Sequence, residues 1–317
     1  MAAPLPVLFV GGIVADISVS GLDRFPEPET EFTPRSDVWH DQPARLLVGG
    51  PAANSAVVYS ALAGPCTVGG PIGRDALGDF LVNTLTSRGV EFFGERVGGT
   101  ATHTIAVGAD GRRQAYYYPG EHIDLGDLAL IWPGGHVYLT ALSLVADRPI
   151  VPGAQAIAAM AHATGGLTVL DIGQAGPEML DLDEISRLDG AIDIVIGNAY
   201  EFQLVLDRPY ETGRQRFREG FRGVVIVKLG AEGALVDPGP EDPLIPVRGF
   251  PVEVINPVGA GDSFGGGFMV ASGRGASLAG ACEYANAVGA ASISTARGPE
   301  GVTQERVDAI LRSHRPH

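Results

Sequence analysis

Short apolar runs rich in β-branched residues alternate with helical patterns along most of this 317-residue chain. Such runs are typical of strands buried on both faces, because helices cover each side of a parallel sheet. The alternation predicts an α/β fold that is doubly wound, with a mainly parallel sheet flanked by helices. The strand candidates are residues 7–13, 136–140, 167–172, 192–197 and 224–230, and the clearest helical patterns are residues 51–63, 75–89, 152–165 and 278–294.

Two regions interrupt this alternation and predict a second, smaller sheet. Residues 16–48 are polar and rich in proline, with little helical periodicity. Within residues 95–120, the segment 100–118 contains two alternating runs around Asp110-Gly111, a pair that favours a hairpin turn. We expect the two regions to form a small β-sheet lid on a single domain that covers residues 1–317. The alternative is a surface loop beside an ordinary hairpin.

The charge balance limits the partners that this chain could bind. The formal net charge is −15, from 37 acidic and 22 basic residues. Nucleic acids and anionic membrane surfaces need basic protein surface, so we expect neither as a partner. The net charge does not exclude small anionic ligands, because a positively charged local site can oppose the negative field of the whole protein.

The cysteines and the N-terminus indicate a cytoplasmic protein. Cys66 and Cys282 are the only cysteines, which predicts two small buried side chains in a reducing compartment and no disulfide framework. Residues 1–14 lack a basic segment before their apolar run, so they predict a first strand and no signal peptide. No apolar stretch reaches the roughly 18 residues that span a bilayer.

Residues 256–268, NPVGAGDSFGGGF, place three small residues directly before an acid. We expect a strand at 251–255, a glycine turn and then a helix, an arrangement that presents free N–H groups to an anion. A bound phosphate would repel an acid in that turn, so the acid needs a function of its own. Asp262 would accept a hydroxyl proton while the N–H groups hold phosphoryl oxygens. The alternative is a plain helix N-cap, a common role for aspartate.

A second glycine-rich stretch, LLVGGPAANSA, predicts a site for hydroxyl groups. Gly49 and Gly50 expose backbone beside the amide of Asn54, near the start of a helix. The alternative is a glycine turn with Asn54 as a helix cap. The sequence lacks a GxxxxGK[ST] motif and has no GxGxxG after its first strand, so neither a P-loop nor a dinucleotide fingerprint is present.

Five stretches occur in the order found in one enzyme family: GGIVADI, GGPAANSA, GRDALGDF, NAYE and NPVGAGDSFGGGF. On these motifs, the chain resembles the ribokinase-like (PfkB-type) carbohydrate and nucleoside kinases over nearly its whole length. The GAGDSF signature is the most specific of the five. The resemblance implies an α/β domain with a β-sheet lid. It also implies transfer of the γ-phosphoryl group of ATP, with Mg²⁺, to a hydroxyl of a small sugar or sugar-like alcohol.

The resemblance also implies roles for individual residues. Asp262 matches the catalytic base of the family, and Gly259, Ala260 and Gly261 match its anion hole, whose N–H groups receive charge that develops on the phosphoryl oxygens. The acceptor contacts of the family correspond to Asp16, Gly49, Gly50 and Asn54.

The same resemblance implies a nucleotide site and a magnesium site. Asn198 and Glu201 fit the NxxE element that organises Mg²⁺, its waters and the phosphates, although they equally fit the first turn of a helix. Lys228 would meet a phosphate as a point charge, or else extend to solvent from a strand end. The positions implied for the nucleotide are Asn198, Lys228, Gly230, Gly233 and Asn286, and Glu201 is implied for Mg²⁺, through water.

Departures from the family pattern leave several questions open. Asn256-Pro257 stands where the family often has Asp-Thr, which puts activation by a monovalent cation in doubt. The tyrosines at 116–118 resemble lid segments of adenosine-kinase-like members, so a nucleoside kinase is an alternative, although the tyrosines equally fit a strand. A catalytically silent ligand sensor is a third possibility.

Family members frequently pair through the lid, so we expect a homodimer.

Overall fold

The structure, a computed structural model, describes residues 5–313 except 24, 26–37, 39, 122–123, 142–149 and 174–179. Its main sheet has nine strands in the order β13-β12-β11-β10-β9-β8-β1-β4-β5, parallel from β5 to β11 and antiparallel beyond β11. The α/β class and the mainly parallel sheet are therefore confirmed. The strands are β1 (Val7–Val10), β4 (Cys66–Gly69), β5 (Val90–Phe93), β8 (His136–Thr140), β9 (Thr168–Asp171), β10 (Ile194–Asn198), β11 (Val224–Lys228), β12 (Gly233–Asp237) and β13 (Ile245–Arg248).

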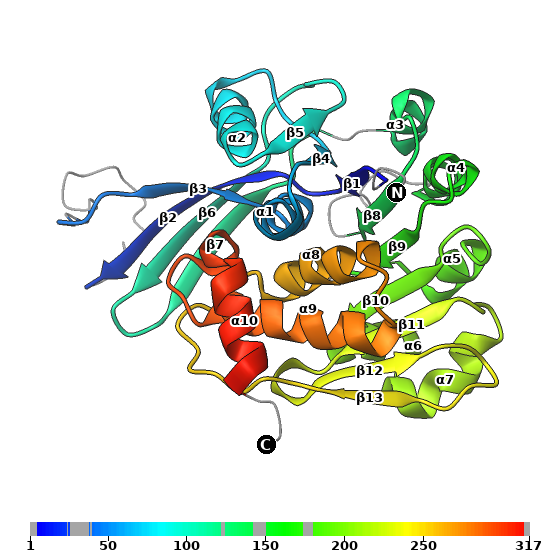
Figure 1. Ribbon diagram of the computed structural model, residues 1–317. Coiled ribbons are helices and arrows are strands. Elements are labelled where there is room, and N and C mark those ends of the chain that lie inside the picture. Colours follow the sequence, from blue (N-terminus) through cyan, green and yellow to red (C-terminus); the bar gives the residue numbers. More distant parts are fainter. Residues whose placement is uncertain are drawn as a thin grey trace.

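Helices cover both faces of this sheet because its strands are apolar on both sides. On β1, Leu8 and Val10 belong to one core, and Val7 and Phe9 belong to the other. Helices α3 to α7 cover the first core, and α1, α2, α8 and α9 cover the second, with α10 packed on α9 (Figure 1). The helices are α1 (Pro51–Ala63), α2 (Ala76–Ser87), α3 (Leu125–Ile131), α4 (Ile150–Ala163), α5 (Leu182–Arg187), α6 (Ala199–Leu206), α7 (Tyr210–Arg218), α8 (Ala260–Gly273), α9 (Leu278–Ile293) and α10 (Gln304–Ser313), with 3₁₀ turns at Gly230–Glu232 and Gly298–Gly301.

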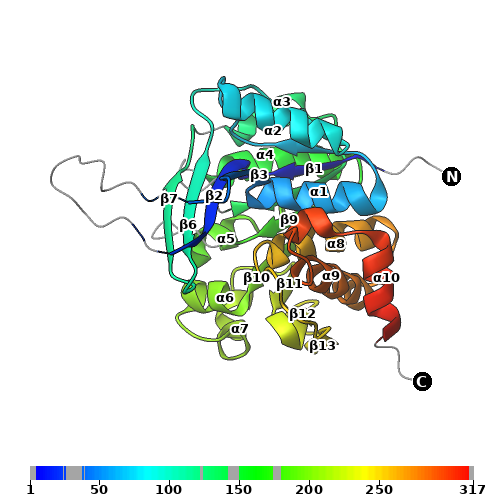
Figure 2. The same ribbon diagram turned by 90° about the vertical axis from the view of Figure 1, so that its left-hand side faces the viewer.

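A second sheet of four strands, here called the small sheet, has the order β3-β2-β6-β7. Its strands are β2 (Val14–Leu22), β3 (Arg45–Gly49), β6 (Thr102–Gly108) and β7 (Arg113–Tyr118). Figure 1 shows it projecting from the main sheet, and Figure 2 shows its strands side by side. β6 and β7 form the predicted antiparallel hairpin, with Gly111 at a positive φ of 82° in the turn. The part of the predicted region at 26–37 lies outside the described residues.

The strand predicted at residues 251–255 is wrong. Val254 and Ile255 are exposed, and the Ile255 N–H donates to the carbonyl of Ile293 (2.8 Å) at the end of α9. The chain therefore approaches the GAGD turn as a segment bonded to a helix end, and no strand of the described residues pairs with it. Four short strands, β4, β5, β12 and β13, were not predicted from the sequence.

Other expectations concern cysteines and membranes. Cys66 and Cys282 are both buried and free, as predicted. Among the described residues, no helix combines the length and the apolar character needed to cross a bilayer.

Candidate active site

The GAGD turn forms the N-terminus of α8. Gly259 is the N-cap residue with a φ of 79°, and a Cβ there would lie 2.4 Å from Cγ of Pro299. The first helical hydrogen bond runs from the Ser263 N–H to the Gly259 carbonyl (2.8 Å). The N–H groups of residues 260–262 come before this bond, so they lack the helical acceptor four residues earlier, as expected at a helix start. This is the cluster of donors that the sequence predicts for an anion.

Asp262 is not the N-cap of this helix, so that alternative is wrong. Its Oδ2 accepts a hydrogen bond from Nδ2 of Asn54 (2.8 Å), and its carbonyl accepts one from Oγ of Ser55 (2.9 Å). Burial raises the pKa of the Asp262 carboxyl, and the Asn54 bond opposes that rise. The result is a fixed carboxylate with increased basicity beside the anion site.

Asn54 does not cap its own helix either. α1 begins at Pro51 after Gly50, which is the N-cap and contributes no side-chain bond. Asn54 lies one turn inside α1, where its amide reaches Asp262 in α8. The alternative of Asn54 as a helix cap is therefore wrong, and its amide forms a hydrogen bond between α1 and α8 instead.

Asp16 lies on β2, against the end of β3. A Cβ at Gly49 would lie 2.2 Å from Oδ2 of Asp16, so only glycine leaves room for this carboxylate. Gly50 has a φ of 90°, and a Cβ there would meet the Gly12 carbonyl oxygen at 2.4 Å. Burial raises the pKa of Asp16 to about 6; Arg113 opposes the rise and the negative charge of Asp262 adds to it. Asp16 and Asp262 are therefore close enough to interact electrostatically.

His103 and Arg113, which the sequence analysis did not single out, lie beside Asp16. Asp16 on β2, His103 on β6 and Tyr117 on β7 are aligned across the small sheet. Nδ1 of His103 is 3.6 Å from Oδ1 of Asp16, and its Nε2 is 3.2 Å from Nη2 of Arg113. Since arginine only donates, Nε2 is the acceptor and the imidazole is neutral with its proton on Nδ1. Burial and the Arg113 charge lower the pKa of His103, which agrees with this assignment.

Lys228 lies at the carboxyl end of β11, near the GAGD turn. Its Nζ donates to both carboxylate oxygens of Asp171 (3.0 and 2.9 Å), and Oδ2 of Asp171 also accepts from the Tyr138 hydroxyl (2.7 Å). A Cβ at Gly261 would be 3.4 Å from Nζ. Burial alone would lower the pKa of Lys228, but the charges of Asp171 and Glu201 raise it. Extension of Lys228 into solvent is therefore wrong: the side chain is a buried cation beneath the anion site.

Asn198 and Glu201 form a capping box at the start of α6. The Asn198 backbone N–H and Nδ2 donate to the two Glu201 oxygens (2.6 and 2.7 Å), and the Glu201 N–H donates to Oδ1 of Asn198 (2.9 Å). Burial raises the pKa of Glu201, while the charge of Lys228 opposes the rise. In the described part of the chain, no three His, Cys, Asp or Glu side chains cluster as metal ligands. One buried carboxylate fits an Mg²⁺ ion that keeps its waters and binds mainly to phosphates.

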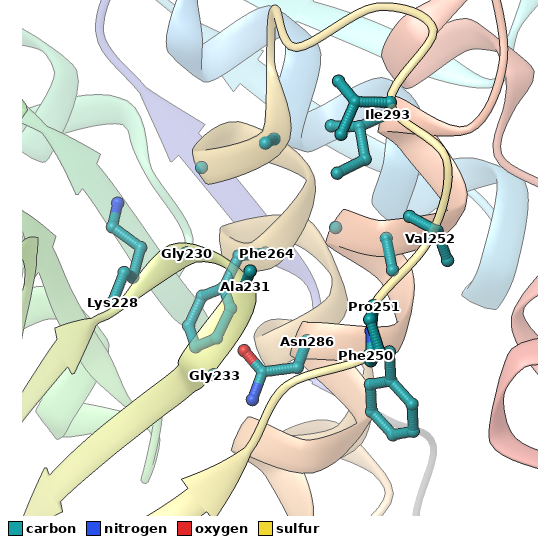
Figure 3. Close-up of a pocket in the computed structure, with 15 residues that line it drawn as sticks. Lys228, Gly230, Ala231, Gly233, Phe250, Pro251, Val252, Phe264, Asn286 and Ile293 are labelled. Carbon is teal, nitrogen blue, oxygen red and sulfur yellow. The ribbon is translucent and has the colours of Figure 1, made fainter. Parts of the chain in front are cut away.

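An apolar pocket adjoins the GAGD turn (Figure 3). Figure 3 shows the turn at residues 230–233 on one side and Phe250 to Val252 on the other, with Lys228 at one end. Asn286 lines it and donates through Nδ2 to the Arg248 carbonyl (3.0 Å). The structure therefore brings the predicted nucleotide positions of β11, the 230–233 turn and α9 into one pocket with Ala260 and Gly261, and places Asn198 outside its lining.

A fixed carboxylate, free helix N–H groups and an adjacent apolar pocket suit phosphoryl transfer from a nucleotide. The model of the pfkB family of carbohydrate kinases matches residues 23–302. The chain belongs to this family. It is therefore an ATP-dependent kinase that phosphorylates a sugar or a nucleoside.

Individual relatives of the kinase differ in their acceptors. It is 30% identical over 312 residues to an ATP-dependent ribose-1-phosphate kinase of Halopiger xanaduensis, covering 96% of this chain and 97% of the relative. It is 27% identical over 295 residues to a nucleoside kinase of Methanothermobacter thermautotrophicus, covering 91% and 89%. The structure of Arabidopsis thaliana ribokinase complexed with ribose and ATP superposes with a TM-score of 0.78, at 21% identity and covering 98% and 99% of the two chains. The last likeness concerns the fold alone.

Proposed function

We propose that this kinase transfers the γ-phosphoryl group of ATP to a hydroxyl of a small sugar, with Asp262 as general base. The observation that carries the proposal is the position of Asp262, which Asn54 fixes at the first turn of α8 beside the free N–H groups. Asp16 interacts electrostatically with Asp262 and would accept hydrogen bonds from the other sugar hydroxyls. The ribose-1-phosphate kinase and the nucleoside kinase named above act on ribosyl compounds or nucleosides, which supports a ribose-type acceptor.

Each neighbouring group has a part in the proposed reaction. Asp262 takes the proton of the attacking hydroxyl, and the N–H groups of residues 260 and 261 stabilise charge that develops on the phosphoryl oxygens. Lys228 adds a positive charge beneath the same oxygens. Mg²⁺, when bound, neutralises phosphate charge; Glu201 and Asn198 would hold it through water. The apolar pocket beside Ala260 would take the adenine and ribose of ATP.

A panel assay tests this function. ADP formation is measured with Mg²⁺ and ATP against pentoses, hexoses, sugar phosphates and nucleosides. We expect turnover with ribose-type compounds, because Asp16 on the small sheet is close enough to Asp262 for the two carboxylates to interact electrostatically, and Asp16 would bind the other hydroxyls of the sugar. ADP formation with nucleosides alone would favour the nucleoside kinase, and silence across the panel with ATP still bound would favour a ligand sensor.

The activity should depend on the ionisation of Asp16. Its pKa is raised to about 6 by burial, with the Asp262 charge adding to the rise and Arg113 opposing it. The carboxylate accepts hydrogen bonds from two hydroxyls more strongly than the protonated acid does, and this form is lost as the pH falls through about 6. We expect kcat/KM for the acceptor to fall about tenfold per pH unit below that value, since this parameter follows the free enzyme.

A pH profile of kcat/KM at saturating ATP measures this dependence. Asp16→Asn should have a lower plateau and lack the step near pH 6. A profile of the variant that keeps the same step would assign it to another group, such as Asp262, whose pKa is raised by burial as well.

A further inference from the structure

The face of the small sheet that carries Asp16 also carries an arginine without a carboxylate partner. This face, here called the Asp16 face, comprises Asp16, His103 and Tyr117, which are paired in register, together with Arg113 four residues before Tyr117 on β7. Residues two or four apart on a strand point to the same side of a sheet. Arg113 is exposed, and across the described part of the chain no carboxylate lies within ion-pair distance of it.

Arg113 uses one of its N–H donors in its contact with His103. Its Nη2 donates to Nε2 of His103, which is a neutral acceptor in this arrangement. A guanidinium has five N–H donors, and it binds a planar or tetrahedral oxyanion through two of them at once. Asp16 is near enough for the charge of Arg113 to lower its pKa, but it forms no ion pair with the guanidinium, so in a chain with a net charge of −15 this cation is available to a negatively charged group of the ligand.

The spacing on this face sets where the negative charge would lie. The ring of His103 separates Asp16 from Arg113, with contacts of 3.6 Å on one side and 3.2 Å on the other. An imidazole and a furanose are both five-membered rings of similar width. A furanose whose hydroxyls bind Asp16 therefore extends far enough for a substituent on its far side to reach Arg113.

We propose that the acceptor is a pentose that already carries a phosphate monoester, and that Arg113 binds this phosphate. The inference rests on the proposed function and deepens it. His103 lies between the two ends of the acceptor site: its Nδ1 is 3.6 Å from Oδ1 of Asp16, and its Nε2 accepts a hydrogen bond from the guanidinium of Arg113. Arg45 lies on the same face by register, opposite Ser18, and adds a second positive charge there. The product would be a bisphosphorylated pentose, formed by transfer of one phosphoryl group with loss of the hydroxyl proton to Asp262.

The test compares acceptors and variants in one assay. ADP formation is followed with Mg²⁺, ATP and either ribose, ribose 1-phosphate, ribose 5-phosphate or a nucleoside. We expect one of the phosphorylated pentoses to have the highest kcat/KM of the panel. Arg113→Ala should lower kcat/KM for that acceptor about 10- to 100-fold more than it lowers the value for ribose, because a charge-assisted bidentate contact is lost.

A matched control and a conservative variant separate recognition from structure. Arg112 is adjacent in the chain but pairs with Asp110 in the hairpin turn (2.6 Å), so Arg112→Ala should leave all acceptor preferences unchanged. Arg113→Lys should recover part of the lost selectivity, because it keeps the charge. Without ATP, the preferred phosphopentose should raise the melting temperature of the wild type more than that of Arg113→Ala.

The outcomes distinguish this inference from the proposed function. Preference of the wild type for ribose or for a nucleoside, or equal losses for charged and neutral acceptors in Arg113→Ala, would overturn the inference and leave the kinase function intact. Absence of ADP formation with every acceptor would overturn the proposed function and this inference with it.

Discussion

Asp262→Asn should lower kcat about 10²–10⁴-fold while the protein keeps its fold and its affinity for ATP. The substitution preserves the size of the side chain, and Oδ1 of an asparagine can still accept the bond that Asn54 donates through Nδ2 (2.8 Å). What the variant loses is a group that can take the hydroxyl proton. Burial raises the pKa of the Asp262 carboxyl, so the proton transfer is better matched to neutral pH than with an exposed aspartate.

Steady-state kinetics with the preferred acceptor measure this loss. Asp183 is a matched control, because it is an exposed aspartate in the first turn of another helix, α5, away from the GAGD turn. Asp183→Asn should keep wild-type kcat. If Asp262→Asn kept full activity, the general-base assignment would be wrong, and the carboxylate would then serve only to hold Asn54.

The main sheet was predictable because its central strands are apolar on both sides. Runs such as 224–230 contain enough β-branched residues to be recognised without their neighbours, and β11 lies within that run. β12 and β13 were missed because glycine and proline weaken their strand pattern: β12 begins at Gly233, and Ile245–Arg248 contains Pro246. Residues 251–255 had the opposite property: a strand-like composition without a strand beside it, since the backbone is bound to the end of α9.

The site was predictable where its residues follow one another in a motif. Gly259 to Asp262 form one turn, so their relation is contained in a single stretch of sequence. His103 approaches Asp16 only because β2 and β6 pair in parallel, a long-range register that neither stretch specifies alone. The partner of Asn54 was hidden for the same reason, since α1 and α8 are far apart in the chain.

Lys228→Met should lower the free energy of unfolding by about 3–5 kcal/mol, because it leaves a buried carboxylate without its cation. Side-chain exposure is only 13% for Lys228 and 8% for Asp171, so we expect water to replace the lost partner poorly. The Tyr138 hydroxyl would still donate to Oδ2 of Asp171 (2.7 Å), but it carries no charge to offset the carboxylate. Urea denaturation of the wild type and the variant measures the difference.

Two further variants test whether the effect comes from burial of the pair. Combining Lys228→Met with Asp171→Asn removes both charges and should recover much of the lost stability, which a double-mutant cycle quantifies. Arg222 and Asp189 form a control pair at a similar distance (2.8 Å), but the arginine is 79% exposed. Arg222→Met should therefore cost less than about 1 kcal/mol. Equal losses in Lys228→Met and Arg222→Met would mean that water reaches Asp171 after the substitution, and that Lys228 serves the phosphoryl oxygens more than the stability of the sheet.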